Sequence, residues 1–321
     1  MATMRDIAKK AGVGVGTVSR ALSDTGYTAK KTRARILAAA DEMGYDYESA
    51  GRIRQKTVSV GILLPLLRHP FFAKMADFIE MELQKFDYRS IIINNGNKSN
   101  HQTELLEMLD ENIINGLIVL DSPPPDFDGR GQRAIVSMDR NWGPDVPIVH
   151  SDHAQGGRLA AEAFLECGCQ SVIQFIGGQL NPSFHSRHTV LEHILRDNGC
   201  QVTSVHTPWN IMGYSYDRGI IRDYWNVIRE MDGCMTNDVA AVSCLALAQE
   251  NGVRVPEELR IIGYDGTELT QLCQPILSVV EQDFATLAKC CVERIMELLE
   301  GTTPVEMETI VPVIWKKGGT T

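Results

Sequence analysis

The chain has 321 residues, of which 44% are hydrophobic and 22% charged, and its formal net charge is −10. This length suggests two or three domains, and the composition is that of an ordinary globular protein. The longest apolar run, residues 58–67, is interrupted by Gly61 and Pro65. It is shorter than the roughly 20 residues that a membrane-spanning helix needs. The first ten residues contain no apolar signal core, so we expect a cytoplasmic protein.

The charge is unevenly distributed along the chain. Residues 1–56 contain eleven Lys and Arg against six Asp and Glu, a net charge of +5, whereas the remainder contains 20 against 35, a net charge of −15. A small basic head on an acidic body is typical of nucleic-acid-binding proteins. The eight cysteines form no C-x-x-C pair and no zinc-finger spacing, so we expect reduced, mostly buried thiols and neither a metal nor another cofactor.

The head, residues 1–45, is expected to contain three short helices. Thr3, with an aspartate three residues later, resembles a capping box at the start of the first helix, and Gly12 is placed to end that helix. The second helix is expected to begin near Val15. Thr28 is a candidate cap for the third helix, which a glycine at position 44 is placed to end.

The pattern changes after a polar linker, residues 46–57. From residue 58, short runs rich in Val and Ile alternate with helical stretches, which indicates parallel sheets covered on both faces. One sheet cannot accommodate so many units, so we expect an α/β body of two lobes. The expected boundaries are about 58–149 with 282–308 for the first lobe, and 150–281 with 309–321 for the second. Residues 214–228 are expected to form one helix and residues 308–315 one strand.

The stretch AGVGVGTVSRAL contains Gly12, Gly14 and Gly16 at alternate positions. A dinucleotide-binding glycine loop would follow a strand, and a P-loop would end in Gly-Lys followed by Ser or Thr. Here the glycines follow a helix and no lysine comes after them. Helix, glycine turn and a second helix carrying Arg20 instead fit a helix-turn-helix, whose second helix enters the major groove of DNA.

The sequence MRDIAKKAGVGVGTVSRAL resembles the N-terminal signature of the lactose-repressor (LacI/GalR) family of bacterial regulators. The similarity continues through EMGY at the end of the third helix and along nearly the whole chain. It implies a ligand-controlled DNA-binding repressor that acts as a homodimer on a near-palindromic operator. IGYDGT and the terminal KKGGTT resemble the sucrose-operon repressor branch, and the chain shows no heptad tail for a coiled-coil tetramer.

The resemblance assigns base discrimination to Val15 and Gly16, and contacts to phosphates and bases to the residues that follow them. Alternatively, Val15 and Gly16 serve only the geometry of the helix. The expected DNA-binding residues are Thr3, Val15, Gly16, Thr17, Ser19, Arg20, Thr28, Arg52 and Ile53.

Two departures from the family pattern concern DNA binding. Gly14 stands where the family has a serine that caps the second helix, and glycine is a somewhat weaker cap. The linker DYESAGRIRQ looks about two residues shorter than the family's hinge helix, which inserts an apolar residue into the minor groove and kinks the operator. Ile53 is its only aliphatic candidate for that wedge; alternatively, Ile53 anchors the linker or lies in solvent.

The body resembles sugar-binding proteins of the periplasmic type, which implies an effector site between the lobes. Most of the matching residues follow strands, where open α/β sheets bind ligands. Carboxylate, amide and guanidinium groups suit vicinal hydroxyls, and aromatic rings suit the apolar face of a sugar. The expected effector-binding residues are Phe72, Asp139, Arg187, Trp209, Asn237, Asp265 and Gln282. Asp238 precedes a helix and is a candidate for its cap.

Other ligands and functions remain open at this point. His185 with Arg187 suits a sugar phosphate, and an arginine beside a stacked phenylalanine suits a purine corepressor. An enzyme is disfavoured because the chain lacks a G-x-S-x-G elbow, a Walker motif and metal-spaced residues. HSDH at 150–153 is instead expected to cap the next helix. A sugar carrier or receptor would leave the basic head without a role.

Overall fold

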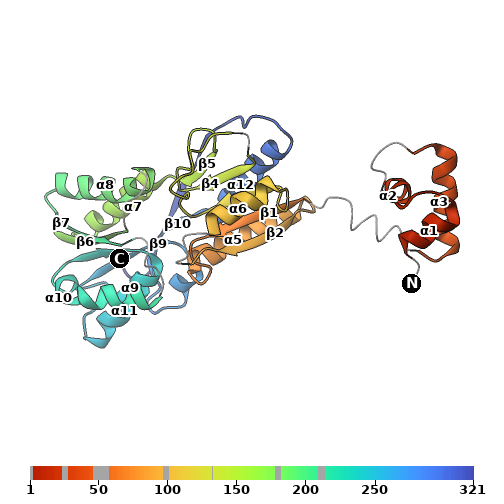
Figure 1. The fold of residues 1–321 in the computed structure, drawn as a ribbon. Coiled ribbons are helices and arrows are strands. Elements are labelled where there is room, and N and C mark those ends of the chain that lie inside the picture. Colours follow the sequence, from red (N-terminus) through yellow and green to blue (C-terminus); the bar gives the residue numbers. More distant parts are fainter. Residues whose placement is uncertain are drawn as a thin grey trace. The chain divides into compact units, whose positions relative to one another are not determined.

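The computed structural model describes residues 3–23, 28–45, 58–96, 101–131, 133–177, 182–208 and 214–321. The chain divides into two compact units, residues 1–58 and 59–321, which are described separately (Figure 1). No helix in the described ranges is long and apolar enough to cross a membrane. The linker at 46–57, with Arg52 and Ile53, and Trp209 all lie outside the described residues.

The head consists of three helices, α1 (Met4–Ala11), α2 (Val15–Ser23) and α3 (Lys30–Glu42). The predicted capping box is confirmed, because Thr3 Oγ1 accepts a hydrogen bond from Asp6 N, and the Asp6 carboxylate accepts one from Thr3 N. Gly12 ends α1 with a left-handed φ of 60°. The sequence therefore fixes the first turn locally at both ends.

Each helix of the head contributes to one small core. Ile7, Val18 and Ile36, one from each helix, are fully buried. The prediction that Thr28 caps α3 is wrong: the cap position belongs to Ala29, which has no side chain to accept a hydrogen bond. Thr28 lies one residue too early to reach the first free amides of α3, and its Oγ1 is buried without a hydrogen-bond partner.

In the described residues the first lobe contains a six-stranded sheet of order β11-β5-β4-β3-β1-β2, in which every pair is parallel. Its helices lie between strands in sequence, as expected for parallel pairing. Helix α12 packs against β3, β4 and β5 and against α5. The elements are β1 (Ser59–Leu64), α5 (Pro70–Gln84), β2 (Arg89–Asn94), α6 (His101–Asp110), β3 (Gly116–Val119), β4 (Ile135–Met138), β5 (Ile148–Ser151), α12 (Phe284–Leu299) and β11 (Glu308–Val311).

The described part of the second lobe contains a sheet of order β12-β10-β9-β8-β6-β7, in which β12 runs antiparallel to β10 and the other pairs are parallel. The expected all-parallel arrangement is therefore wrong for one edge strand. The elements are α7 (His153–Glu166), β6 (Ser171–Gly177), α8 (Pro182–Asp197), β7 (Gln201–Thr207), α9 (Tyr214–Asp223), α10 (Trp225–Ile228), β8 (Gly233–Met235), α11 (Asp238–Glu250), β9 (Arg260–Asp265), the 3-10 turn η1 (Glu268–Gln271), β10 (Ser278–Gln282) and β12 (Val313–Lys316).

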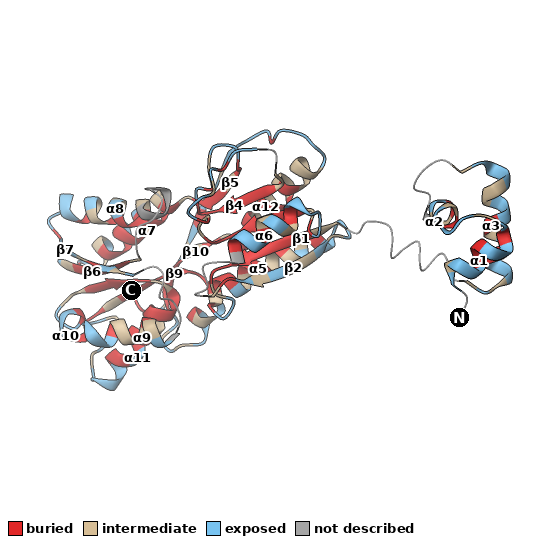
Figure 2. Cartoon of the chain, viewed as in Figure 1, coloured by how far each residue is buried: buried red, intermediate tan, exposed pale blue. Residues whose placement is uncertain are grey.

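Successive residues of the second sheet are buried on opposite faces. Val172 packs in the cluster under α7 and α8, whereas the adjacent Ile173 packs in the cluster under α9 and α11. This explains why its strands are continuously apolar rather than alternating. Figure 2 shows the buried residues concentrated along the strands and the inward faces of the helices.

The chain crosses between the lobes three times, and the crossings lie slightly later than expected. β5 continues to Ser151 and β10 continues to Gln282. The single strand expected at 308–315 is divided by Pro312 into β11 and β12. β11 joins the first sheet and β12 the second, because proline interrupts the backbone ladder. The strands therefore place the first lobe at about 59–151 with 283–311.

Two further expectations can be compared with the structure. The single helix expected at 214–228 is two helices, α9 and α10, separated at Tyr224. All eight cysteines lie in the described part of the chain and are free thiols, five of them buried.

Candidate functional site

A cavity lies between the two lobes of the body, at the carboxyl ends of strands from both sheets. It encloses about 1040 Å³ of space between atoms, including its open side. Asp139 follows β4 in the first lobe, while Asp265 and Gln282 end β9 and β10 in the second. Parallel strands place their carboxyl ends at one edge, so residues far apart in sequence meet here.

Six of the seven predicted effector-binding residues line this cavity; the seventh, Trp209, lies outside the described residues. The six are Phe72, Asp139, Arg187, Asn237, Asp265 and Gln282. Phe72 is buried and meets the edge of Phe71 at a ring distance of 5.2 Å. Phe71 and Phe175 also line the cavity, so aromatic rings form part of its lining.

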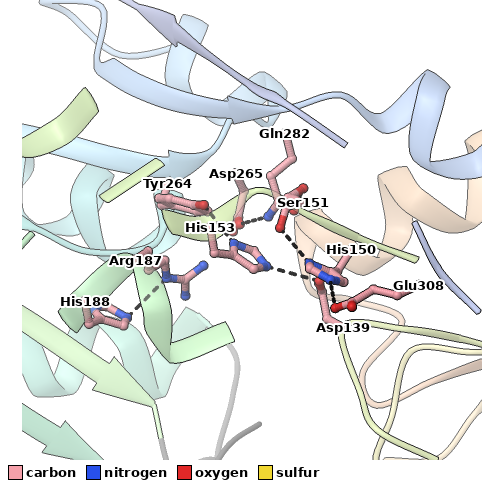
Figure 3. A network of polar contacts seen from close by, with 10 residues as sticks. All are labelled: Asp139, His150, Ser151, His153, Arg187, His188, Tyr264, Asp265, Gln282 and Glu308. Atoms are coloured by element: carbon pink, nitrogen blue, oxygen red, sulfur yellow. Dashed lines mark hydrogen bonds and ion pairs between the residues drawn. The ribbon is translucent and has the colours of Figure 1, made fainter. Parts of the chain in front are cut away.

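Arg187 is held over an aromatic ring. Its guanidinium carbon lies 4.2 Å from the centre of the Tyr264 ring, a cation–π contact. Its Nε donates to His188 Nε2 at 3.2 Å. Figure 3 shows Arg187 between His188 on one side and Tyr264 with His153 on the other.

A chain of hydrogen bonds joins the lobes through His153. Burial lowers the pKa of His153, so the ring is neutral and carries one N–H. The Tyr264 hydroxyl lies 2.8 Å from His153 Nδ1, and His153 Nε2 lies 3.1 Å from Asp139 Oδ1 (Figure 3). Since the carboxylate only accepts, His153 donates through Nε2 to Asp139 and accepts a hydrogen bond from the Tyr264 hydroxyl at Nδ1. Burial raises the pKa of Tyr264, which keeps this hydroxyl protonated.

The pKa values of Asp139 and Asp265, two of the aspartates that line the cavity, are shifted in opposite directions. Burial raises the pKa of Asp139, but the contacts with His153 and Arg140 outweigh it and hold the pKa below its ordinary value. Burial raises the pKa of Asp265 to about 7, although Arg187 and the Gln282 amide oppose this. Both residues have positive φ, 58° for Asp139 and 121° for Asp265, a conformation that L-residues adopt at a cost. Such strain is concentrated at functional sites in proteins.

Asn237 caps a helix and also lines the cavity. Its side chain accepts from Ala240 N at 2.9 Å and so caps α11, and its Nδ2 donates to Asp217 Oδ1 at 3.2 Å. Asp238 is therefore not the cap. It is buried, and its Oδ2 accepts from Thr267 N and Thr267 Oγ1, which braces the turn after β9.

Sequence reasoning missed several polar residues of the cavity, among them His69, Arg140, Asp217 and His188. Burial lowers the pKa of Arg140 to about 10, so it remains charged at neutral pH, and burial lowers the pKa of His69 to about 4, so its ring is neutral. The positions of Arg140 beside Asp139 and of His69 before Phe72 were available signals. Asp217 lies on a helix, and nothing in the sequence indicates which way that helix faces.

The HSDH stretch has two roles. Asp152 caps α7 by accepting from Gln155 N at 2.8 Å, as predicted. The second role belongs to His150, whose Nδ1 lies 2.9 Å from Ser151 O and whose Nε2 lies 2.9 Å from Glu308 Oε1 on β11 (Figure 3). In the part of the chain that the structure describes, no group of three His, Cys, Asp or Glu side chains is placed to hold a metal ion.

In the head, α2 has one buried and one exposed face. Val18 and Ala21 are buried in the three-helix core, whereas Val15, Gly16 and Arg20 are exposed. Thr17 Oγ1 accepts a hydrogen bond from Arg20 Nη2 at 3.5 Å, and Ser19 is partly exposed. The exposed face of α2 therefore carries the residues that the sequence assigned to DNA, and Thr3 lies exposed at the start of α1.

Both units of the chain match known families. Residues 3–46 match the lacI family of bacterial regulatory proteins, and residues 161–321 match the periplasmic binding protein-like domain. The sucrose operon repressor of Streptococcus mutans is 30% identical over 309 residues, which cover 94% of this chain and 93% of that protein. The ribose operon repressor of Bacillus subtilis is 30% identical over 326 residues, covering 98% and 97%.

The fold is also found in solved structures. A periplasmic binding protein/LacI transcriptional regulator from Alkaliphilus metalliredigens, complexed with D-xylulofuranose, matches with a TM-score of 0.72 and 22% identity over 82% of this chain and 98% of that one. Together, the helix-turn-helix head, the two-lobed body and relatives that align along nearly the whole length show that this chain belongs to the LacI family of bacterial regulatory proteins, which are effector-controlled transcriptional repressors.

Proposed function

We propose that the effector of this repressor is a neutral sugar, bound in the cavity between the lobes. The observation that carries this is the mixed lining of the cavity, in which the polar Asp139, Arg187 and Asp265 occur together with the aromatic rings of Phe71 and Phe72. Carboxylate and guanidinium groups hydrogen-bond pairs of hydroxyls, and aromatic rings cover the C–H face of a sugar. The relatives named for the sucrose and ribose operons support the same class.

The charges of the cavity favour a neutral ligand over a sugar phosphate. Three carboxyl groups, those of Asp139, Asp217 and Asp265, accompany two guanidinium groups, those of Arg140 and Arg187. A phosphate would meet the Asp139 and Asp217 carboxyl groups in a buried site, where like-charge repulsion is strong. A purine would leave most of these hydroxyl-binding groups without partners, which is costly in a buried site.

We further propose that residues 1–45 bind operator DNA and that residues 46–57 form the hinge to the body. Val15, Gly16, Thr17, Ser19 and Arg20 would face the major groove, supported by the exposure of this side of α2. A homodimer would present two such helices to a near-palindromic operator. Thr3, Thr28, Arg52 and Ile53 complete the DNA-binding set inferred from the sequence.

The test combines a ligand panel with DNA selection. Isothermal titration of the full chain with sucrose, D-fructose, D-ribose, D-fructose 6-phosphate and hypoxanthine identifies the ligand class. Selection from random duplex DNA, with and without the ligand that binds, then identifies the operator and the direction of control. Heat from a neutral sugar, with a change in affinity for the selected DNA, is the expected result. Binding of only the phosphate or only hypoxanthine contradicts the neutral-sugar proposal.

A further inference from the structure

A line of polar side chains runs from the cavity into the second lobe, buried at its start and partly exposed at its far end. It starts at Arg187 and continues through His188 on α8, Gln174 on β6, Ser204 on β7 and Glu192 on α8. Gln174 is fully buried and His188 is 4% exposed. We call His188, Gln174, Ser204 and Glu192 the polar chain.

The groups at the two ends of the polar chain determine the direction of each hydrogen bond within it. Arginine only donates, so His188 Nε2, 3.2 Å from Arg187 Nε, must accept and carry no proton. A neutral ring then carries its proton on Nδ1, which donates to Gln174 Oε1 at 2.9 Å. The Nε2 amide of Gln174 is thereby left to donate, and it does so to Ser204 Oγ at 2.9 Å.

The far end of the polar chain is a carboxylate. The Ser204 hydroxyl donates to Glu192 Oε2 at 2.8 Å, and Glu192 Oε1 forms an ion pair with Arg196 Nη2 at 2.7 Å. The hydrogen bonds between these side chains therefore all donate in the same sense, from Arg187 towards Glu192, and the Gln174 amide also donates to the His188 carbonyl oxygen at 3.3 Å. Such a series selects one tautomer of His188 and one orientation of the Gln174 amide.

Arg187 is fixed on other sides as well. Tyr264 lies under the guanidinium, and the backbone of Arg187 packs against Gly157, where an added Cβ would approach the Arg187 carbonyl oxygen to 2.2 Å. The contact with His188 sets the remaining rotation, because it determines where the Nε edge of the planar guanidinium points. Holding a planar group before the ligand arrives reduces the ordering cost of binding.

We propose that His188, in the tautomer that its contacts with Arg187 and Gln174 select, is a positioning residue that orients Arg187 for the effector. This inference rests on the proposed function of the cavity. His188 also lines the cavity, and in this proposal it acts by holding Arg187, while Gln174 acts through His188. Polar groups in an otherwise apolar layer cost stability unless they are fully paired, so a purely packing role would be filled better by apolar residues.

The first test needs no effector. In full-length protein labelled with 15N-histidine and 15N-arginine, we expect His188 to carry its proton on Nδ1 and the Arg187 Nε–H to exchange slowly with water. Gln174→Met keeps the side-chain length but removes the amide. It is expected to weaken the preference for that tautomer, because only the Arg187 contact then selects it, and to speed exchange at Arg187. A proton on Nε2 of His188 in the wild-type chain overturns the proposal.

The second test uses sugar binding, with sucrose, D-fructose and D-ribose as probes. His188→Phe keeps a ring but has no acceptor, and should weaken binding about tenfold or more, the size expected for losing a charge-assisted hydrogen bond. His188→Gln places an amide oxygen near the former Nε2 and should recover most of that loss. His193→Phe, on the exposed side of the same helix, is the matched control and should bind like the wild type.

The outcomes separate the two proposals. Equal affinity of the Phe and Gln variants of His188 overturns the positioning role, whatever the stability of each. If none of the three sugars binds the wild-type chain, the proposed effector class fails instead, and the tautomer and exchange measurements alone decide whether His188 orients Arg187.

Discussion

Ser151 and Gln282 are 131 residues apart in the sequence, yet Ser151 Oγ donates to Gln282 Oε1 at 2.7 Å. Ser151 ends β5 in the first lobe and Gln282 ends β10 in the second, so the bond ties together two of the crossings between the lobes. The amide of Gln282 in turn donates to Asp265 Oδ1 at 2.8 Å. A cavity carboxyl group is thus linked directly to the crossings about which the lobes can move (Figure 3).

Asp265→Asn is expected to stabilise the protein in a pH-dependent way. In the unfolded chain Asp265 ionises near pH 4, whereas burial raises its pKa to about 7 in the folded protein. As the pH rises from about 4 to 7, the unfolded state loses this proton first, so the wild-type chain loses stability across that window. Asparagine does not titrate, and its oxygen still accepts from Gln282.

The stability of Asp265→Asn relative to the wild type should therefore increase by roughly 2–4 kcal/mol between pH 4 and pH 7. Urea unfolding at a series of pH values measures this difference, with exposed Asp126→Asn as the control. A difference that does not vary with pH would falsify the prediction. Sugar binding should weaken in the same variant, because a hydroxyl acceptor is lost.

Lys74 is expected to hold the lobes together. Its Nζ, on α5 of the first lobe, donates to Gly266 O at 3.0 Å and pairs with Glu268 Oε1 at 3.0 Å, both in the second lobe. The ammonium also lies 4.5 Å from the Phe284 ring centre. Glu268 is largely exposed, so the carbonyl contact is the stronger of the two.

Lys74→Met should lower the free energy of unfolding by about 1–2 kcal/mol, mainly by leaving the Gly266 carbonyl without its donor. Lys289→Met is the control, because Lys289 pairs only loosely with Glu293 on the same helix and should change stability by less than about 0.5 kcal/mol. Chemical denaturation of both variants provides the comparison. Equal effects would mean that the contact between the lobes contributes nothing.

Gly157→Ala is expected to separate two helices. At this position an added Cβ would lie 2.2 Å from the Arg187 carbonyl oxygen, so α7 and α8 would have to move apart. We expect a loss of about 1–3 kcal/mol, together with weaker sugar binding, because Arg187 would move with α8. Gly219→Ala on α9 meets nothing within 4 Å and should instead stabilise by about 0.5–1 kcal/mol. Thermal unfolding distinguishes the two, and a stabilised Gly157 variant would exclude the close packing.

Gly16→Ala tests why a glycine lies on the exposed face of α2. No atom lies within 4 Å of a Cβ added there, and the backbone is not in the left-handed region. Alanine should therefore stabilise α2 by about 0.5–1 kcal/mol, seen as greater amide-exchange protection. If the glycine allows DNA to approach closely, affinity for the selected operator should fall in the same variant. Unchanged affinity would show that position 16 is not at the DNA surface.

Much of the cavity could be predicted because its residues follow apolar strands. Asp139 and Asp265 each come directly after such a run, and parallel pairing brings strand ends together whatever their separation in sequence. Asp217 could not be found this way, because it lies on a helix whose facing direction depends on how α9 packs against α11. The role of His153 was hidden because it depends on Asp139 and Tyr264, which belong to different lobes.

The lobe boundaries were harder to predict than the fold. The run from Ile148 to Ser151 continues into α7 without a glycine or proline, so nothing local marks the crossing. Pro312 does mark the third crossing, but the sequence does not show that the strands before and after this proline join different sheets. Thr28 was wrongly placed as a cap because Thr, Ala and Lys follow one another without a change in helical pattern.

The three crossings also determine the order in which the lobes can be completed during synthesis. The first lobe needs α12 and β11, which follow all of the second lobe except its edge strand β12 along the chain. Until residue 299 has left the ribosome, β3, β4 and β5 lack the complete helix that covers them, and until residue 311 has done so, β5 lacks its neighbouring strand β11. The second lobe can assemble β6 to β9 earlier. A nascent chain that stops near residue 282 would therefore expose the apolar face of the first sheet and become a substrate for chaperones.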